Sequence, residues 1–245
     1  MNKSESRPKI VIALGGSILL PSLEAHAIHA YVPVILEIAK KTQVYIVVGG
    51  GKIAREYISV ARSIGADEAT SDEIGIAVTR INASLLISAL GDAAYPLVPT
   101  SYHEALSYGY SERIVVMGGI VPGQTTDAVS AVLAERVSAS ILVNATSIDG
   151  IYSADPNNPA YAKTAKRYDT ITTIKLLEIV QQGSMQAGSN NIMDLVAVKM
   201  IERCGTPLVV LDGRDPANVL SALQTGTFIG TVVSEDGTSP LPLIS

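Results

Sequence analysis

The chain has 245 residues and a formal net charge of −5, with 18 lysine and arginine residues against 23 aspartate and glutamate residues. This length lies at the upper end of a single domain, and 47% hydrophobic with 17% charged residues is typical of a folded globular protein. The acidic balance and the 4% of aromatic residues argue against a nucleic-acid partner, which is bound through clustered basic groups and stacked rings.

Cysteine content and hydropathy bear on the location of the protein. Cys204 is the single cysteine, which excludes an internal disulfide and a cysteine-based metal site and fits a reducing compartment. Uninterrupted apolar runs reach about five residues, as at 44–48, whereas a membrane-spanning helix needs about 20. We therefore predict a cytoplasmic protein that binds no membrane.

Short runs of β-branched residues alternate along the chain with segments of helical periodicity. The runs predict strands buried on both faces, at residues 10–14, 44–48, 114–117, 141–144 and 208–211. The helical pattern is clearest over residues 72–90, where Ile74, Val78, Ile81 and Leu85 form one apolar stripe. This alternation predicts an α/β fold, a three-layer αβα sandwich with a mainly parallel central sheet.

Helix starts are marked by capping patterns. Thr70 and Ser101 are each followed three residues later by a glutamate, which predicts capping boxes at both positions. Asp215 precedes a proline, a combination typical of an N-cap and the first helical position. The glycine- and proline-containing tail over residues 234–245 is expected to be a loose end.

Glycines follow three of the predicted strands, at residues 15–16, 49–51 and 118–119. Glycine lets backbone N–H groups approach a ligand closely, and a helix that follows adds its positive N-terminal end. A single turn of this kind is explained by a tight strand-to-helix connection alone. Three of them at the carboxyl ends of parallel strands meet at one sheet edge, and so predict one large, phosphate-rich site.

The second glycine turn allows two interpretations. Gly49, Gly51 and Ala54 match the GxGxxA pattern of dinucleotide-binding proteins, which keeps an oxidoreductase as an alternative, whereas the Walker-type GxxxxGK[ST] pattern is absent from the sequence. Lys52 and Arg55 place two cations beside these glycines. This charge favours a phosphoryl group in transfer, because arginine holds its oxygens through paired N–H donors.

Five segments together resemble the amino acid kinase family and, within it, the archaeal-type uridylate kinases. They read IALGGSIL (12–19), VVGGGKIAR (47–55), SDEIGIAVTRINA (71–83), MGGIVPGQTTDAV (117–129) and NATSIDGIYSADP (144–156). The resemblance implies one domain over residues 1–245, with a UMP side up to about residue 135 and an ATP side from about 136 onward. It also implies transfer of the ATP γ-phosphoryl group to UMP in pyrimidine nucleotide biosynthesis, with Mg²⁺ accompanying ATP, and a homohexamer.

The resemblance also assigns site residues to the two substrates. Those implied for ATP are Gly15, Gly16, Ser17, Gly51, Arg55, Thr146, Tyr152 and Asp155. Those implied for UMP are Gly50, Asp72, Val121, Pro122, Gly123, Gln124, Thr125, Thr126 and Asp127. Chemistry agrees with this division, because glycine amides suit phosphates, a carboxylate suits the ribose hydroxyls and a tyrosine suits an adenine edge.

The chain departs from the family where catalytic charge is concerned. Ala13 and Asn191 stand where many members have lysine. We therefore assign the charge that stabilises the transition state to Arg55 and Mg²⁺, with Lys52 as a second candidate. Because the acceptor is already a phosphate anion, no general base is required, and the three histidines, His26, His29 and His103, are interpreted as ordinary surface or packing residues.

Two further functional hypotheses remain open on the sequence. One is a related kinase acting on carbamate, an amino acid or isopentenyl phosphate, although that last branch carries a histidine near the position of Arg55. The other is a non-catalytic nucleotide-binding storage or regulatory protein of the same fold, suggested by the two missing lysines.

Overall fold

The computed structural model describes residues 7–154, 164–184 and 193–244. Its strands are β1 (Lys9–Leu14), β2 (Gln43–Val48), β3 (Val115–Met117), β4 (Ile141–Thr146), β5 (Thr170–Thr172), β6 (Leu208–Asp212) and β7 (Gly230–Ser234). Its helices are α1 (Gly16–Leu19), α2 (His26–Ala39), α3 (Gly51–Ser63), α4 (Glu68–Leu90), α5 (Tyr102–Gly109), α6 (Thr126–Val137), α7 (Thr173–Ser184), α8 (Leu195–Cys204) and α9 (Pro216–Thr225), with a 3₁₀ turn η1 (Gly91–Ala93) after α4.

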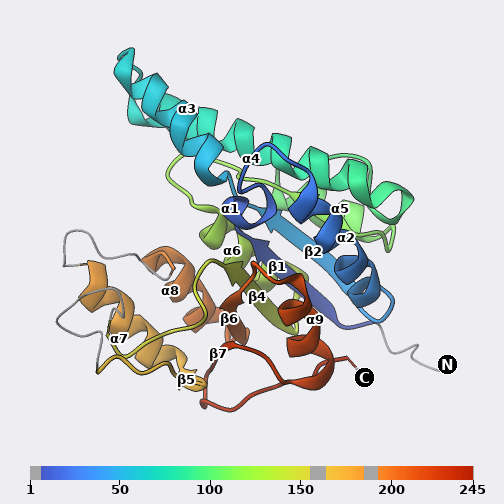
Figure 1. Cartoon of the computed structure of the whole chain (residues 1–245), viewed down its shortest axis with the longest axis vertical. Helices are drawn as coiled ribbons and strands as arrows, with labels where there is room; N and C mark the ends of the chain where they lie inside the picture. The colour runs from blue at the N-terminus through green and yellow to red at the C-terminus, as the bar shows by residue number, and fades with distance from the viewer. Residues whose placement is uncertain (1–6, 155–163, 185–192, 245) are drawn as a thin grey trace.

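The strands form one sheet in the order β3-β2-β1-β4-β6-β7-β5. Neighbouring strands are parallel except β6 and β7, which are antiparallel. The five predicted strands are all present, and β5 and β7 extend the sheet at one edge. Helices cover both faces, so the predicted three-layer α/β sandwich is confirmed (Figure 1).

Two hydrophobic cores lie on opposite faces of the sheet. Alternate residues of β1 divide between them, with Ile10 and Ile12 in one core and Val11 and Ala13 in the other. The first core is closed by α1, α2, α4 and α9, and the second by α5, α6, α7 and α8. Both faces of the central strands are therefore buried, which explains why their sequences are apolar without alternation.

Helix α4 differs from its prediction in both its start and its buried face. It begins at Glu68, after an N-cap Asp67 whose side chain accepts from the backbone N–H of Thr70, so the predicted cap at Thr70 was wrong by three residues. Ile81 and Leu85 are 60% and 42% exposed, so the predicted apolar stripe is only partly buried. Beside apolar residues such as Val78 and Leu86, the buried face also carries the polar side chains of Thr79 and Asn82, which bond to main-chain atoms of Gly119 and Gly49.

Helix α4 is also long and apolar enough to cross a membrane. Within the described residues, Glu68–Ala93 is the single helical stretch with the length and composition of a membrane span, and the core helix of a globular protein can have the same length and composition. In the structure α4 contacts α3, β2 and β3, and Figure 1 shows α3 and α4 side by side at the top of the molecule. These contacts make it an integral helix of the α/β sandwich.

The other local predictions had mixed outcomes. Ser101 and Asp215 are the N-caps of α5 and α9, as predicted. The tail is not a loose end, because the backbone N–H groups of Leu243 and Ile244 donate to the carbonyl of Leu223 and the Ile244 side chain is 4% exposed. An apolar residue near the end of the chain thus packs into the first core, which the polar composition around it did not indicate.

Candidate functional site

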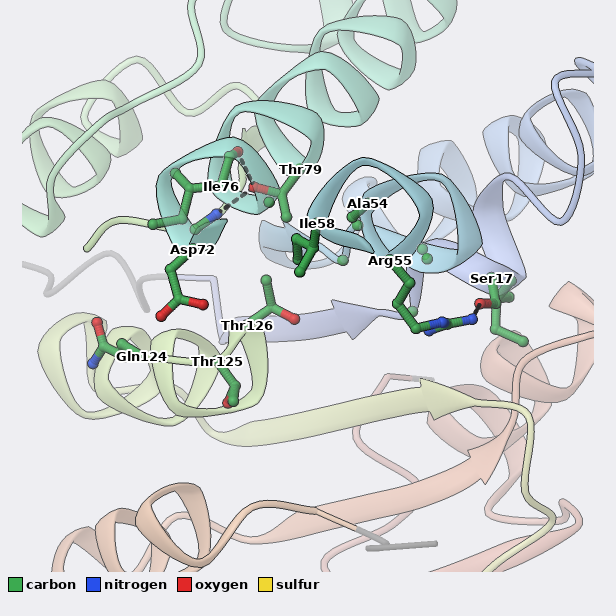
Figure 2. Close-up of a pocket in the computed structure, with 18 of the residues that line it drawn as sticks. Ser17, Ala54, Arg55, Ile58, Asp72, Ile76, Thr79, Gln124, Thr125 and Thr126 are labelled. Atoms are coloured by element: carbon green, nitrogen blue, oxygen red, sulfur yellow. Dashed lines mark hydrogen bonds between the residues drawn. The ribbon is translucent and has the colours of Figure 1, made fainter. Parts of the chain in front are cut away.

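A cleft of about 630 Å³ opens at the carboxyl ends of β1, β2, β3 and β4. Its wall includes the three glycine turns, which we call the β1 turn (residues 15–17), the β2 turn (residues 49–51) and the β3 turn (residues 118–120). Figure 2 shows Ser17 and Arg55 at one end of the cleft and Asp72 and Gln124 at the other. The sheet edge predicted to hold a ligand is therefore the place where the cleft lies.

The β1 and β2 turns touch each other through their main chains. A Cβ atom built on Gly16 would lie 2.3 Å from both the Gly49 oxygen and the Gly51 nitrogen. Gly51 has φ +66° and faces the Gly16 main chain, so a side chain there would be strained as well as crowded. Glycine is thus required at these two positions, because only bare main chains can approach so closely.

Arg55 extends from α3 to the β1 turn at one end of the cleft. It projects from the first two turns of α3, and its Nη2 donates to Ser17 Oγ of the β1 turn at 3.3 Å (Figure 2). The guanidinium therefore lies where the β1 and β2 turns meet, with donors left for an anion. Lys52 is different: its ammonium lies 3.6 Å from Glu56 on the exposed face of α3, outside the cleft lining.

Asp72 stands at the opposite end of the cleft on α4. Its Oδ2 accepts from the backbone N–H of Gly123 at 2.8 Å, which joins α4 to the loop after β3. In Figure 2 its carboxylate faces the side chains of Gln124 and Thr126. The Gln124 side chain is in turn held by the Tyr102 hydroxyl, which donates to Gln124 Oε1 at 3.3 Å.

The start of α6 brings two carboxylates close to the cleft. Thr125 is the N-cap of α6; its hydroxyl oxygen accepts from the backbone N–H of Ala128, and the hydroxyl donates to Asp194 Oδ2. Asp194 also caps α8. Burial, and secondarily the charge of Asp194, raise the pKa of Asp127 to about 6. Asp127 therefore carries a carboxylate whose ionised form is disfavoured by its surroundings.

The cleft also extends to the end of β4. Thr146 and Ser147 line it there. Tyr152 lies beyond the lining, where its hydroxyl donates to Asp149 Oδ2 at 3.0 Å, and Arg167 Nη1 lies 3.4 Å from the same oxygen. Desolvation, a hydrogen bond to Asp149 and the charge of Asp149 raise the pKa of Tyr152. Asp155 and Asn191 lie outside the described residues.

Most residues predicted for the site come together in this one cleft. The lining contains Gly15, Gly16, Ser17, Gly50, Gly51, Arg55, Asp72, Val121, Gly123, Gln124, Thr125, Thr126 and Thr146. Pro122 lines a smaller adjoining hollow beside Arg80, and Asp127 and Tyr152 lie close to the cleft without lining it. No histidine lines the cleft within the described part of the chain, and His26, His29 and His103 are exposed.

Sequence analysis missed the polar side chains of α4 that face the turns. Thr79 lines the cleft and accepts from a backbone N–H of the β3 turn, and Asn82 donates to the β2 turn. Both follow Asp72 and Gly75 at spacings of three and four, which places all four on one helix face. That spacing was the available signal, but it was obscured by the apolar residues between them.

Comparisons with known proteins agree on one family. The model of the Amino acid kinase family matches residues 8–212. A uridylate kinase of Methanospirillum hungatei is 57% identical over 237 residues, which is 96% of this chain and 99% of that protein. The crystal structure of uridylate kinase from Archaeoglobus fulgidus has a TM-score of 0.83 at 45% identity and covers 92% of this chain and 100% of its own. UMP kinase from Ureaplasma parvum has a TM-score of 0.78 at 26% identity and covers 94% and 99%.

Proposed function

The chain belongs to the amino acid kinase family, and we propose that it is a UMP kinase, which transfers the γ-phosphoryl group of ATP to UMP and releases ADP and UDP. The relatives and solved structures that carry this activity in their names match nearly the full length of both chains. The observation in the structure that carries the proposal is the contact between the β1 and β2 turns, with Arg55 beside it, in one cleft whose other end carries Asp72.

The two ends of the cleft fit two different nucleotides. At the α4 end, we assign UMP to Asp72 and the loop over residues 121–127, where a carboxylate is available for ribose hydroxyls and Gln124 for a base. At the other end, we assign the phosphates of ATP to the β1 turn and its base and ribose to Thr146, Tyr152 and Asp155. The phosphates of both nucleotides then meet at the β2 turn, whose glycines line the cleft at the N-terminus of α3.

The proposed reaction is an in-line displacement at the γ-phosphorus. A phosphate oxygen of UMP forms the new bond, and the bond from the γ-phosphorus to the bridging oxygen breaks, with its electron pair leaving on ADP. The attacking oxygen is already anionic, so no proton has to be removed. The chain accordingly orients the phosphates through the glycine turns and supplies positive charge through Arg55. Ala13, on β1, stands where many family members have a lysine and carries no charge.

We propose Mg²⁺ as the ion that accompanies ATP. The described residues contain no group of three or more histidine, cysteine, aspartate or glutamate side chains arranged to hold a metal. This fits an ion carried mainly by phosphate oxygens and water, which is how Mg²⁺ is commonly bound with nucleotides. When bound, Mg²⁺ supplies charge neutralisation on the phosphates, while the β1 and β2 turns hold those phosphates in place.

We also propose a homo-oligomer, specifically a hexamer, located in the cytoplasm and acting in pyrimidine nucleotide biosynthesis. The paired helices α3 and α4 support the assembly, because Tyr57, Val60 and Ile81 on them, and Ile64 directly after α3, are each at least 58% exposed. Apolar side chains gathered on adjacent helices are typical of an interface. Light scattering should give a mass near six times the 25.6 kDa of one chain, and a monomer would contradict this part of the proposal.

A substrate panel tests the proposed activity. The purified protein is given ATP and Mg²⁺ with UMP, CMP, carbamate or isopentenyl phosphate, and ADP release is measured by a coupled assay. Turnover on UMP in the ordinary enzyme range, about 1 to 10³ s⁻¹, is the expected result. Faster turnover on carbamate or isopentenyl phosphate would identify a related kinase, and nucleotide binding without product would identify a binding protein.

A further inference from the structure

We infer that Thr79 and Asn82 are positioning residues, which hold the β3 and β2 turns at a fixed spacing along one face of α4 so that the acceptor and the transferring phosphoryl group meet. This inference rests on the proposed UMP kinase activity. It concerns two side chains that neither the sequence motifs nor the comparisons assign to the reaction. Both are more than nine-tenths buried, at 6% exposed for Thr79 and 2% for Asn82.

Asn82 fixes the main chain of the β2 turn. Its Nδ2 donates to the carbonyl of Gly49 at 2.9 Å and, at 3.4 Å, to the carbonyl of Gly50. In a planar trans peptide, the N–H of the next residue points away from the carbonyl that precedes it. The carbonyls are held toward α4, so the N–H groups of Gly50 and Gly51 are directed away from α4.

The direction of these N–H groups matters because the β2 turn consists of glycines, so only its main-chain groups can contact a ligand. A Cβ atom on Gly50 would lie 2.4 Å from the Ala54 side chain, and one on Gly51 would lie 2.6 Å from the main chain of Gly16. Glycine leaves the backbone free to choose among several conformations, so something else must select one of them. The buried amide of Asn82 contributes to that selection, together with the Gly49 N–H, which donates to the carbonyl of Leu14, and the Ala54 N–H, which donates to the carbonyl of Gly50.

Thr79 does the same for the β3 turn. Its hydroxyl accepts from the backbone N–H of Gly119 at 2.7 Å and donates to the carbonyl of Ile76 at 2.6 Å, as the dashed lines in Figure 2 show. Arg80 completes the contact by donating to the carbonyls of Gly119 and Ile120 at 3.1 and 3.2 Å. Both polar groups of the Gly119 main chain are thus bonded to α4.

Asp72 extends this face of α4 to the UMP end of the cleft, through its bond to the Gly123 N–H. Positions 72, 79 and 82 lie on one helix face, and the ten steps from residue 72 to residue 82 span about 15 Å at 1.5 Å per step. A single rigid helix therefore sets the separation between the UMP loop, the β3 turn and the β2 turn. A displacement on the order of 1 Å between reacting groups is enough to cost about 10²-fold in rate.

The first test compares Thr79→Val, which removes the hydroxyl at nearly constant shape, with Thr79→Ser, which retains it. Thr79→Val should raise the KM for UMP about 10-fold, while the KM for ATP stays within about 2-fold. Thr79→Ser should restore the KM for UMP to within about 3-fold of the parent value. Ser84→Ala is the matched control, because Ser84 makes the same kind of bond within α4, to the Arg80 carbonyl, but bonds to no turn.

Asn82→Leu tests the second contact. Because the β2 turn lies at the junction of the two nucleotides, this variant should lower kcat about 10-fold with both KM values changed less than about 3-fold. Asn82→Asp should be at least as impaired, since a carboxylate cannot donate to the two carbonyls. If Asn82→Leu raised both KM values by as much as it lowered kcat, or left all three unchanged, the role assigned to Asn82 would be overturned.

A measurement without substrate separates this inference from the proposed activity. Hydrogen–deuterium exchange of the nucleotide-free protein should show faster exchange at the Gly119 amide in Thr79→Val, and unchanged exchange in Thr79→Ser. If Thr79→Val does not fold, Arg80→Ala loosens the same turn from a half-buried position and should raise the KM for UMP in the same direction. Unaltered exchange at Gly119 would overturn the inference, whereas a parent protein that exchanges as expected but phosphorylates no UMP would overturn only the proposed function.

Discussion

On the α4 side of the cleft, buried side chains bond to main-chain atoms of the turns, whereas beyond the end of β4 partly exposed side chains bond mainly to one another. Asn82 and Thr79 are buried and bond to glycine peptides. Arg167 and Asp149 are 29% and 42% exposed, and with Tyr152 they form a network of side chains. The α4 side therefore depends on buried hydrogen bonds to the backbone, whose loss leaves a polar group unpaired. The β4 side depends on partly exposed side chains, whose interactions are weakened by solvent.

The comparison predicts that changes to the glycine turns will have the largest effects. Gly16→Ala should lower kcat/KM at least about 10²-fold, because its Cβ would separate the β1 and β2 turns. The coupled UMP assay measures this loss. Gly65→Ala separates crowding in the cleft from backbone strain away from it: its Cβ would meet no atom within 4 Å, but its φ of +89° strains alanine, so it should lower stability and leave kcat/KM unchanged. A Gly16→Ala protein with parental kinetics would show that the contact between the turns is not needed.

Arg55→Ala should have the next largest effect. Removing the guanidinium takes away the cation above the junction, and turnover should fall at least about 10-fold, the cost of one charge-assisted contact. Arg55→Lys keeps the charge but loses the paired donors, so it should recover only part of the rate. A turnover number for Arg55→Ala within error of the parent would remove Arg55 from the mechanism.

Asp72→Ala should act on one substrate only. The KM for UMP should rise about 10-fold, because the variant loses both the proposed ribose contact and the bond that holds Gly123. The KM for ATP should stay unchanged. An increase confined to ATP would show that the two nucleotides occupy the opposite ends of the cleft from those assigned here.

The carboxylates Asp127 and Asp212 should give stability changes of opposite sign. Burial raises the pKa of Asp127 to about 6, so its ionised form destabilises the folded state as pH rises from about 4 to above 6. Asp127→Asn should therefore raise Tm by about 2–4 °C at pH 8 and leave it unchanged near pH 3.5. A hydrogen bond from Arg214 lowers the pKa of Asp212, so its ionised form stabilises the folded state above about pH 4.

Asp212→Asn should accordingly lower Tm slightly at pH 8, with the difference vanishing as the pH falls through the lowered pKa of Asp212. Thermal unfolding followed by circular dichroism at pH 3.5, 6 and 8 measures both variants without nucleotide. A decrease in Tm for Asp127→Asn at pH 8 would show that this carboxylate is stabilised by its surroundings.

Lys52→Ala should have the smallest effect. Lys52 is exposed and its ion pair with Glu56 lies outside the cleft, so kcat and both KM values should change less than about 2-fold. A loss comparable to that of Arg55→Ala would mean that the side chain turns into the cleft when nucleotides bind. The same kinetic assay distinguishes the two outcomes.

Much of the fold was predictable because its signals are local. Runs such as residues 44–48 are apolar without alternation, which indicates a strand buried on both faces. Ser101 and Asp215 were identified as N-caps because serine and aspartate are preferred at the start of a helix. The N-cap of α4 was misplaced because Asp67 and Thr70 both suit that position, and the choice between them depends on where α3 ends. β5 and β7 were missed because their apolar runs are short: β5 is an edge strand of three residues, and β7 lies between β6 and β5 with five.

The face of α4 was the most informative error. Periodicity selected Ile81 and Leu85 for burial, yet both are exposed, while Thr79 and Asn82 face inward. A polar side chain can be buried only where it finds hydrogen-bond partners, and here those partners are glycine peptides far away in the sequence. No property of the helix sequence by itself reveals those peptides.

The amino-acid sequence by itself determined the α/β class, the three glycine turns at one sheet edge and the family to which the chain belongs, because each follows from residue types at short spacing. Only the tertiary structure decided that Gly16 and Gly51 touch, that Arg55 rather than Lys52 reaches the cleft, and that α4 holds two turns through buried polar groups. These are contacts between residues distant in the chain, and they exist only once the sheet has brought the strand ends together.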